Sequence, residues 1–157
     1  MITCEFEDGG KASLRHAVVD CIVLQDNKVL LAKRSPKLTE GGKWGLVGGF
    51  MDRNETIKEA IQREIYEETG WEIDGLTLLS IIDTPNRKNE DRQNVCFLFF
   101  CNGIKQTGKP DWESTEIKWF DLKDLPPEQE LAFDHAQSIQ LYKKYIKEKF
   151  SLPYSNY

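Results

Sequence analysis

Apolar and polar positions alternate in short blocks over the first third of the chain. Residues 16–24 and 28–33 are rich in β-branched and other apolar side chains, and the polar residues 25–27 separate them. This pattern predicts two strands joined by a tight turn. Residues 35–49 are rich in Gly and Lys with isolated apolar positions, which predicts a loop that bends around a ligand.

The rest of the chain predicts three further strands. Residues 76–82 and 95–101 are apolar runs, and residues 116–120 alternate between polar and apolar side chains. The polar residues 83–94 connect the first two of these runs. Such a connection is long for a compact domain, so we expect it to contribute to function.

Two segments have the composition of helices. Residues 55–69 are good helix formers without an internal Pro or Gly, and Gly70 supplies a stop. Residues 134–150 predict a C-terminal helix that Asp134 caps. The apolar side of this helix is expected to contain four residues, Ile139, Tyr142, Ile146 and Phe150.

Length and composition predict one domain over 1–157, with an N-terminal extension over 1–14. The 157 residues are 39% apolar and 30% charged, which is close to globular averages. The longest apolar run has seven residues, whereas crossing a bilayer takes about 20. The first fifteen residues contain no block that resembles a signal peptide. We therefore expect a cytoplasmic protein with no membrane partner.

Net charge and cysteine usage argue against two classes of partner. With 21 basic and 26 acidic side chains, the net charge of −5 repels a polyanion, so we expect no nucleic-acid partner. The four cysteines form no CxxC pair, which disfavours a zinc site and structural disulfides.

In the first predicted helix, acidic residues lie on or beside the side that the apolar residues mark as buried. On a wheel with about 100° per residue, four apolar residues mark its buried stripe: Ile57, Ala60, Ile61 and Ile65. Glu64, Glu67 and Glu68 share or border that stripe. Burial of unpaired carboxylates is costly, and Arg63 neutralises only part of the cluster. Converging carboxylates without Cys or His are hard oxygen donors, which predicts a site for Mg²⁺, with Mn²⁺ as the alternative.

Two glycine pairs, Gly41-Gly42 and Gly48-Gly49, precede this helix. Glycine lets the backbone approach a ligand closely, and a loop that leads into a helix N-terminus presents free amides to an anion. Beside the carboxylates, the glycine pairs indicate phosphate binding.

Residues 49–71 read G-x5-E-x7-R-E-U-x-E-E-x-G-U, where U is an apolar residue. This box resembles the signature of the Nudix hydrolases, and its two departures, Val47 before the glycines and Trp71 at the end, replace no charged residue. The order of the flanking strands also resembles the family. The resemblance implies an α/β fold, namely a single-domain α/β/α sandwich with a mixed β-sheet. It also implies Mg²⁺-dependent hydrolysis of a nucleoside diphosphate linked to another moiety.

The resemblance implies roles for single residues. The expected metal ligands are Gly48, through its carbonyl, and the side chains of Glu64, Glu67 and Glu68. Arg63 is expected to orient the carboxylates, and Glu55 to be a supporting acid near the helix start. Similar proteins are often homodimers, so a second copy is the expected protein partner.

The reaction needs a group that removes a proton from the attacking water. Similar enzymes use either a box glutamate or an acid from a loop outside the box. The candidates are Glu67, Glu113 and Glu116, of which we prefer Glu116 without excluding the others.

Aromatic and basic residues near the box are candidates for substrate contacts. Trp44 and Phe50 are able to stack on a base, and Arg34 and Arg92 to bind phosphate or ribose. His135 is a further candidate to reach the site, but a lone histidine near a helix start is more often a surface residue, so the surface is the preferred expectation.

The segments 48–52 and 131–135 look like variants of those in the ADP-ribose-directed branch of the family. This resemblance favours ADP-ribose or a related nucleotide sugar as the substrate. Two alternatives stay open: a house-cleaning hydrolase of nucleoside triphosphates or oxidised nucleotides, and a non-catalytic nucleotide sensor. The complete box favours an enzyme.

Overall fold

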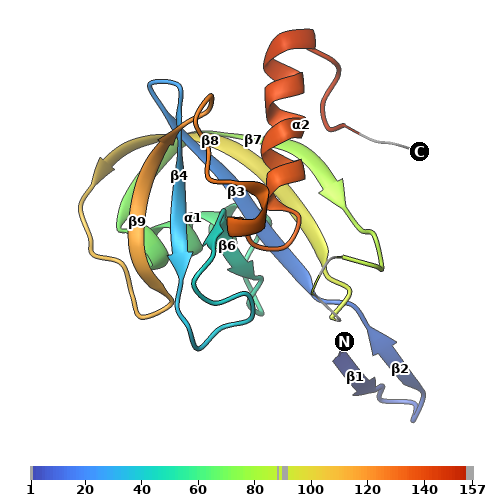
Figure 1. Cartoon of the computed structure of the whole chain (residues 1–157). Coiled ribbons are helices and arrows are strands. Elements are labelled where there is room, and N and C mark those ends of the chain that lie inside the picture. Colours follow the sequence, from blue (N-terminus) through green and yellow to red (C-terminus); the bar gives the residue numbers. More distant parts are fainter. Residues whose placement is uncertain (1, 88, 90–91, 155–157) are drawn as a thin grey trace.

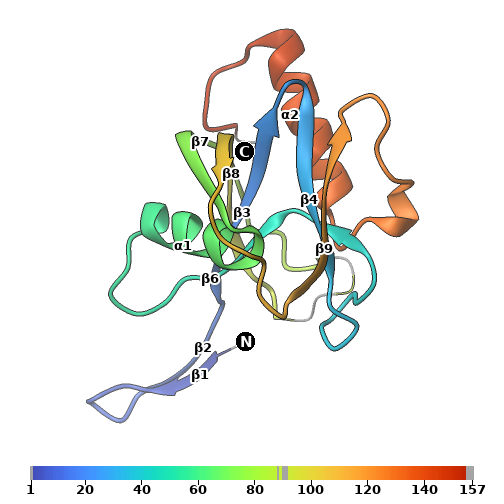
Figure 2. The same cartoon turned by 90° about the vertical axis from the view of Figure 1, so that its left-hand side faces the viewer.

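The computed structural model describes residues 2–87, 89 and 92–154. Within them, two α-helices pack on opposite faces of a mixed seven-stranded sheet, and a two-stranded hairpin projects from it (Figure 1 and Figure 2). This arrangement confirms the expected α/β/α sandwich. Residues 1, 88, 90–91 and 155–157, from the ends of the expected domain and the expected 83–94 loop, lie outside the described residues.

The sheet is organised around one central strand, β3. Its strands are β3 Ala17–Gln25, β4 Lys28–Arg34, β5 Trp44–Gly45, β6 Val47–Phe50, β7 Trp71–Ile82, β8 Val95–Gln106 and β9 Ser114–Asp121. The main path runs β5-β4-β3-β8-β7, while β6 pairs with β3 and β9 pairs with β4. The β3–β8 pair is parallel and the other pairs are antiparallel.

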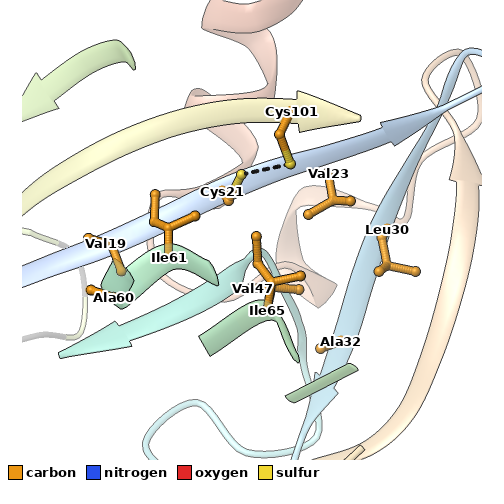
Figure 3. Close-up of a cluster of buried hydrophobic side chains, with 10 residues drawn as sticks. All are labelled: Val19, Cys21, Val23, Leu30, Ala32, Val47, Ala60, Ile61, Ile65 and Cys101. Atoms are coloured by element: carbon orange, nitrogen blue, oxygen red, sulfur yellow. Dashed lines mark hydrogen bonds between the residues drawn. The ribbon is translucent and has the colours of Figure 1, made fainter. Parts of the chain in front are cut away.

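Both faces of β3 are buried, which explains its nearly continuous apolar sequence. Val19, Cys21 and Val23 face α1, in the cluster that Figure 3 shows together with Ile61. Ile22 faces the opposite way, into a second cluster that contains residues of α2. The strand therefore joins two hydrophobic cores.

The first helix, α1, spans Ile57–Thr69 and has clear signals at both ends. Thr56 and Glu59 form a reciprocal capping box at its start, a pattern of the form T-x-x-E that is readable in the sequence. Gly70 ends the helix with a left-handed backbone, φ 70°, as predicted.

The second helix, α2, spans His135–Glu148 and follows a short 3₁₀ turn, η1, at Glu128–Glu130. Asp134 occupies the N-cap position, but its side chain makes no capping hydrogen bond. The expectation of a side-chain cap was wrong because Arg87 engages this carboxylate. Ile139 is fully buried as expected, whereas Ile146 is 40% exposed, so the apolar side is shorter than predicted.

The predicted turn between the first two strands is confirmed. Asp26 and Asn27 both adopt positive φ, 47° and 63°, as a two-residue hairpin turn requires. The predicted loop over 35–49 is partly wrong, because it contains β5 and most of β6. Backbone pairing of β5 with β4 and of β6 with β3 forms these strands, and two of the paired residues in β6 are glycines without a strand-like pattern.

The structure extends several elements beyond their predicted ends. The strands β7 and β8 are each twelve residues long, because they continue as a twisted antiparallel pair past their apolar segments. The polar N-terminal extension forms the hairpin of β1 Ile2–Glu5 and β2 Lys11–Leu14. No helix in the described ranges is long and apolar enough to cross a bilayer.

The end of α1 provides a test of the fold. A Cβ added at Gly70 would lie 2.3 Å from the backbone carbonyl carbon of Gly108, and the φ of Gly70 is also unfavourable for other residues. We expect Gly70→Ala to lower the free energy of unfolding by at least about 2 kcal/mol, measured by urea denaturation.

The matched control is Gly42→Ala. Gly42 has a similar φ of 82°, but a Cβ there meets no atom within 4 Å, so only the backbone cost of about 1 kcal/mol applies. Equal losses for the two variants would contradict the close packing of Gly70 against Gly108.

Candidate functional site

A cleft of about 380 Å³ lies where α1, β6 and the segment before α2 meet. Its lining includes Glu64 and Glu68 from α1, and Gly48 and Gly49 from β6. The connection between β7 and β8 supplies further lining residues, including Arg87, Arg92 and Asn94. The cleft thus combines residues from distant parts of the sequence.

Two of the three helix acids turn inward, as the wheel predicts. Glu68 is 7% exposed and the side chain of Glu64 is 14% exposed, and both line the cleft. The side chain of Glu67 is 53% exposed, so this acid lies at the solvent side of the helix. Glu64 and Glu68 therefore lie on the apolar side of the helix, where unpaired carboxylates are unfavourable.

The paired glycines make room for the buried acids. A Cβ on Gly49 would lie 2.4 Å from Oε1 of Glu64, and a Cβ on Gly48 would lie 2.0 Å from the carbonyl oxygen of Val19. No side chain fits at Gly48, where the neighbouring atoms are backbone, and a side chain at Gly49 would displace the Glu64 carboxylate. The strand β6 therefore passes directly against the Glu64 carboxylate.

Arg63 connects the acids of the box to one another and to β6. Its Nη1 donates to Glu64 Oε1 at 2.8 Å and to Glu67 Oε2 at 3.2 Å. Its Nη2 donates to Glu55 Oε1 at 2.7 Å and to the carbonyl oxygen of Phe50 at 3.0 Å. The hydrogen bond from Arg63 and one from the amide of Asp52 lower the pKa of Glu55 to about 2. This geometry suits the orienting role expected for Arg63.

The electrostatics of the acids favour a cation beside them. Burial raises the pKa of Glu68 well above its ordinary value, and repulsion from Glu64 and Glu113 adds to the effect, while Arg34 opposes it. Burial also raises the pKa values of Glu64 and Glu113. Each of these carboxyl groups is harder to ionise here than in water, so a positive ion nearby would stabilise the charged forms.

The donor set suits a hard divalent cation. Within the described part of the chain, no three acidic, His or Cys side chains already form a closed metal cluster, and Arg63 holds Glu64 and Glu67. The buried carboxylates of Glu64 and Glu68 nevertheless face one cleft beside the main chain of Gly48. Carboxylate and carbonyl oxygens of this kind are the ligands that Mg²⁺ and Mn²⁺ prefer. These residues fit the expected metal.

A network of buried charges forms the opposite wall of the cleft. Nε of Arg87 donates to Oδ1 of Asp134 at 2.6 Å, and its Nη2 donates to Oδ2 of Asp20 at 3.1 Å. Burial acts to raise the pKa of Asp20, but hydrogen bonding from the His135 ring and the charge of Arg87 hold it well below its ordinary value. This network joins β3, the 83–94 connection and the start of α2.

His135 belongs to this network, and its expected surface position was wrong. The ring is 3% exposed, and Nδ1 accepts a hydrogen bond from the amide of Leu46 at 2.9 Å. Nε2 therefore carries the hydrogen and faces Asp20 Oδ2 at 3.6 Å. Packing of the segment before α2 against β5 buries the ring, a contact between residues 89 positions apart.

Of the residues predicted to contact the substrate, some line the cleft and one lies in the hydrophobic core. Arg34 and Phe50 line the cleft, as does Arg92, which lies over the Phe50 ring at 5.5 Å. Trp44 is 8% exposed and packs edge-on against Phe120 in the α2-side core, away from the cleft.

The candidate bases also differ in position. Glu113 lines the cleft close to the helix acids. Glu116 lies on β9 with half of its side chain exposed, and its carboxylate is 4.0 Å from Nζ of Lys33. Glu67 contacts Arg63 at the solvent side.

Sequence reasoning did not identify Asp20, Arg87 or Phe133 as cleft residues. Asp20 is a charged residue within a fully buried strand, which is a readable signal. Arg87 lies in the long polar connection that was expected to be functional. Phe133 has φ 50°, a backbone conformation that the sequence did not indicate, and it lies between the guanidinium groups of Arg34 and Arg87 at 5.1 and 5.2 Å.

The chain is similar to several known proteins. Residues 14–142 match the model of the NUDIX domain. The ADP-ribose pyrophosphatase of Methanocaldococcus jannaschii is 36% identical over 127 residues, which are 81% of this chain and 72% of that protein. The 8-oxo-dGDP phosphatase of Homo sapiens is 34% identical over 113 residues, 69% of this chain but only 33% of that protein.

A solved structure has the same fold. The NUDIX domain of Shewanella oneidensis NrtR, crystallised with ADP ribose, superposes with a TM-score of 0.72 at 25% identity. The match covers 86% of this chain and 90% of that one.

The raised pKa of Glu68 predicts a stability effect. Below the unfolded pKa this group is protonated in both states and costs nothing, whereas at higher pH the folded state must ionise a buried acid. We expect Glu68→Gln to raise the free energy of unfolding of the metal-free protein at pH 8 by roughly 1 kcal/mol or more, and less at pH 5. Urea denaturation in the presence of a chelator measures both values.

Glu67→Gln is the control, because Glu67 is exposed on the same helix. Its effect should stay within about 1 kcal/mol at both pH values. A loss of stability for Glu68→Gln that is the same at pH 5 and pH 8 would show that the buried carboxylate carries no such cost.

Proposed function

The chain belongs to the Nudix family and is a pyrophosphohydrolase of nucleotide phosphoanhydrides, and from this premise we propose that its substrate is ADP-ribose or a closely similar nucleoside diphosphate sugar. The observation that carries the proposal is one cleft lined both by the carboxylates of Glu64 and Glu68 and by three arginines, Arg34, Arg87 and Arg92. A metal-bound diphosphate with a polar group at each end matches this distribution of charge.

The similar proteins support the choice of substrate. The relative with 36% identity is named as an ADP-ribose pyrophosphatase, and a superposable NUDIX domain was crystallised with ADP ribose. Other relatives are named as phosphatases of 8-oxo-dGDP. Their names support the second candidate, an oxidised-nucleotide hydrolase.

Members of this family are typically dependent on a divalent metal. We propose that Glu64, Glu68 and the main-chain carbonyl of Gly48 hold Mg²⁺ here. Glu67 is proposed as a further ligand on the solvent side. When bound, the ion supplies positive charge that polarises the phosphate oxygens. Arg63 keeps the Glu64 and Glu67 carboxylates aligned by its hydrogen bonds.

For the proton of the attacking water we propose Glu113 in place of Glu116. Glu113 lines the same cleft as Glu64 and Glu68, and burial and the charges of Asp111 and Glu67 raise its pKa, while the charge of Arg34 acts against the rise. A raised pKa makes a carboxylate a better base. Glu116, which lies beside Lys33 on β9, does not line the cleft.

Arg34 is proposed to bind the diphosphate. Its Nε donates to the carbonyl oxygen of Thr39, and its guanidinium lies over Phe133, so the group is held in place at the cleft. Its charge also acts on Glu68 and Glu113, which places it close to the acidic wall. A fixed guanidinium beside the metal ligands suits a phosphate oxygen.

A hydrolysis screen tests the substrate and the metal ligand together. We expect Mg²⁺-dependent cleavage of ADP-ribose to AMP and ribose 5-phosphate, and a loss of kcat of at least about 100-fold in Glu68→Gln. Chromatography of the products distinguishes this outcome from release of orthophosphate or pyrophosphate from 8-oxo-dGDP or nucleoside triphosphates. The control Glu148→Gln, on the exposed end of α2, should match the parent.

If Glu68→Gln retained the parent rate on every substrate, the proposed ligand role would be wrong. If 8-oxo-dGDP were cleaved with a far higher kcat/KM than ADP-ribose, the second candidate would replace the first.

The identity of the base is tested by a pair of variants. We expect Glu113→Gln to lower kcat by roughly 100-fold and Glu116→Gln by less than about threefold, because only Glu113 reaches the cleft. The pH dependence of kcat should also lose its acidic limb in Glu113→Gln. The reverse ranking would restore Glu116 as the base.

A further inference from the structure

One corner of the cleft contains a buried polar atom without a partner. Asn94 lines the cleft and is 6% exposed, and its Oδ1 has no hydrogen-bond partner among the residues that the structure describes. Buried polar atoms are usually satisfied, and leaving one unpaired costs about 1–3 kcal/mol. A cleft residue of this kind suits a hydrogen bond with a ligand.

The backbone of Asn94 is fixed by contacts outside the cleft. Nη2 of Arg15 donates to the carbonyl oxygens of Asp83 and Asn94, at 2.5 and 3.1 Å. Nε of Arg15 donates to the carbonyl oxygen of Gln93 at 2.5 Å. The next residue, Val95, begins β8 and donates its amide to the carbonyl oxygen of His16. Asn94 is therefore held in position before any ligand arrives.

An aromatic and cationic surface lies in the same cleft. Phe50 is 41% exposed, and its ring packs edge-on against His16 at 5.2 Å. The guanidinium of Arg92 lies over the Phe50 ring at 5.5 Å. Planar aromatic ligands stack on rings and guanidinium groups of this kind.

We propose that Phe50, Arg92 and Asn94 form the subsite for the nucleobase, in which Asn94 accepts a hydrogen bond from an exocyclic amine of the base. The unpaired atom is an acceptor, so it selects a base edge with a donor, such as the 6-amino group of adenine. This assignment rests on the proposed function only in taking the ligand to be a nucleotide. Arg34 and Arg87, which lie over the Phe133 ring, are then available to bind the rest of the substrate.

The experiment compares binding of AMP and IMP by isothermal titration calorimetry. IMP carries an oxygen in place of the 6-amino group, and neither nucleotide contains the anhydride bond that the enzyme cleaves. We expect the parent protein to bind AMP roughly tenfold more tightly than IMP, because the 6-oxygen of IMP places an acceptor against Oδ1 of Asn94, where AMP has a donor. Asn94→Ala should reduce the ratio to about one, whereas Asn94→Asp, which keeps the acceptor, should retain a preference for AMP.

Two further variants separate the role of the amide from general effects on the fold. Phe50→Leu should weaken AMP and IMP by the same factor, several-fold, because stacking does not distinguish them. Asn102 is exposed on β8, the strand that begins directly after Asn94. Asn102→Ala should therefore change neither affinity.

Equal binding of AMP and IMP by the parent would overturn the proposal, as would a preference that survives in Asn94→Ala or an absence of AMP binding. Should Asn94→Ala fail to fold, the parent ratio, Asn94→Asp and Phe50→Leu still decide the question. The proposed function fails separately, if ADP-ribose is not hydrolysed while the AMP preference is observed.

Discussion

The structure depends on the burial of two carboxylates, Glu64 and Glu68, on the inner side of α1. Their position requires that β6 pass without side chains at Gly48 and Gly49, since a Cβ at either residue would overlap neighbouring atoms. It also requires Arg63, whose guanidinium contacts Glu55, Glu64 and Glu67. Because buried acids are unfavourable in isolation, the helix carries them at a cost in stability that the proposed Mg²⁺ ion would reduce.

A second set of buried charges gives the cleft its other wall. Arg87 is paired with Asp20 and Asp134, and His135 connects Asp20 with the amide of Leu46. These contacts join β3 to segments that lie far away in the chain. Removing one member would leave its partners buried and unpaired, so the network stabilises a single arrangement of the loops around the cleft.

The two walls together explain why this scaffold suits phosphoanhydride chemistry. In the function that we propose, carboxylates on one side of the cleft bind a metal, a guanidinium near them neutralises phosphate oxygens, and Glu113 is the base. The corner formed by Phe50, Arg92 and Asn94 has different properties, since it offers a ring face, a guanidinium face and an acceptor. Under these proposals, catalytic and recognition residues occupy separate regions of one cleft.

Local patterns in the sequence predict part of the fold and the chemistry of the helix acids. Alternating or continuous apolar runs identified β3, β4, β7, β8 and β9 but not the other strands. The spacing of three glutamates on one helix identified the acidic site, because side-chain direction in a regular helix follows directly from sequence spacing. The inward position of Glu64 and Glu68 was predicted in this way. The outward position of Glu67, at the border of the stripe, depended on packing that the wheel does not contain.

Which distant residues meet at the cleft depends on the tertiary structure. His135, Arg87 and Asn94 come from segments whose local sequence gives no direction for their side chains, and the pairing of β3 with β6 and β8 brings them to one place. The pairing of β4 with β5 and β9 places Trp44 in the core and Glu116 beside Lys33. Long-range contacts of this kind arise when strands and helices bury their apolar faces together, and local sequence patterns do not encode them.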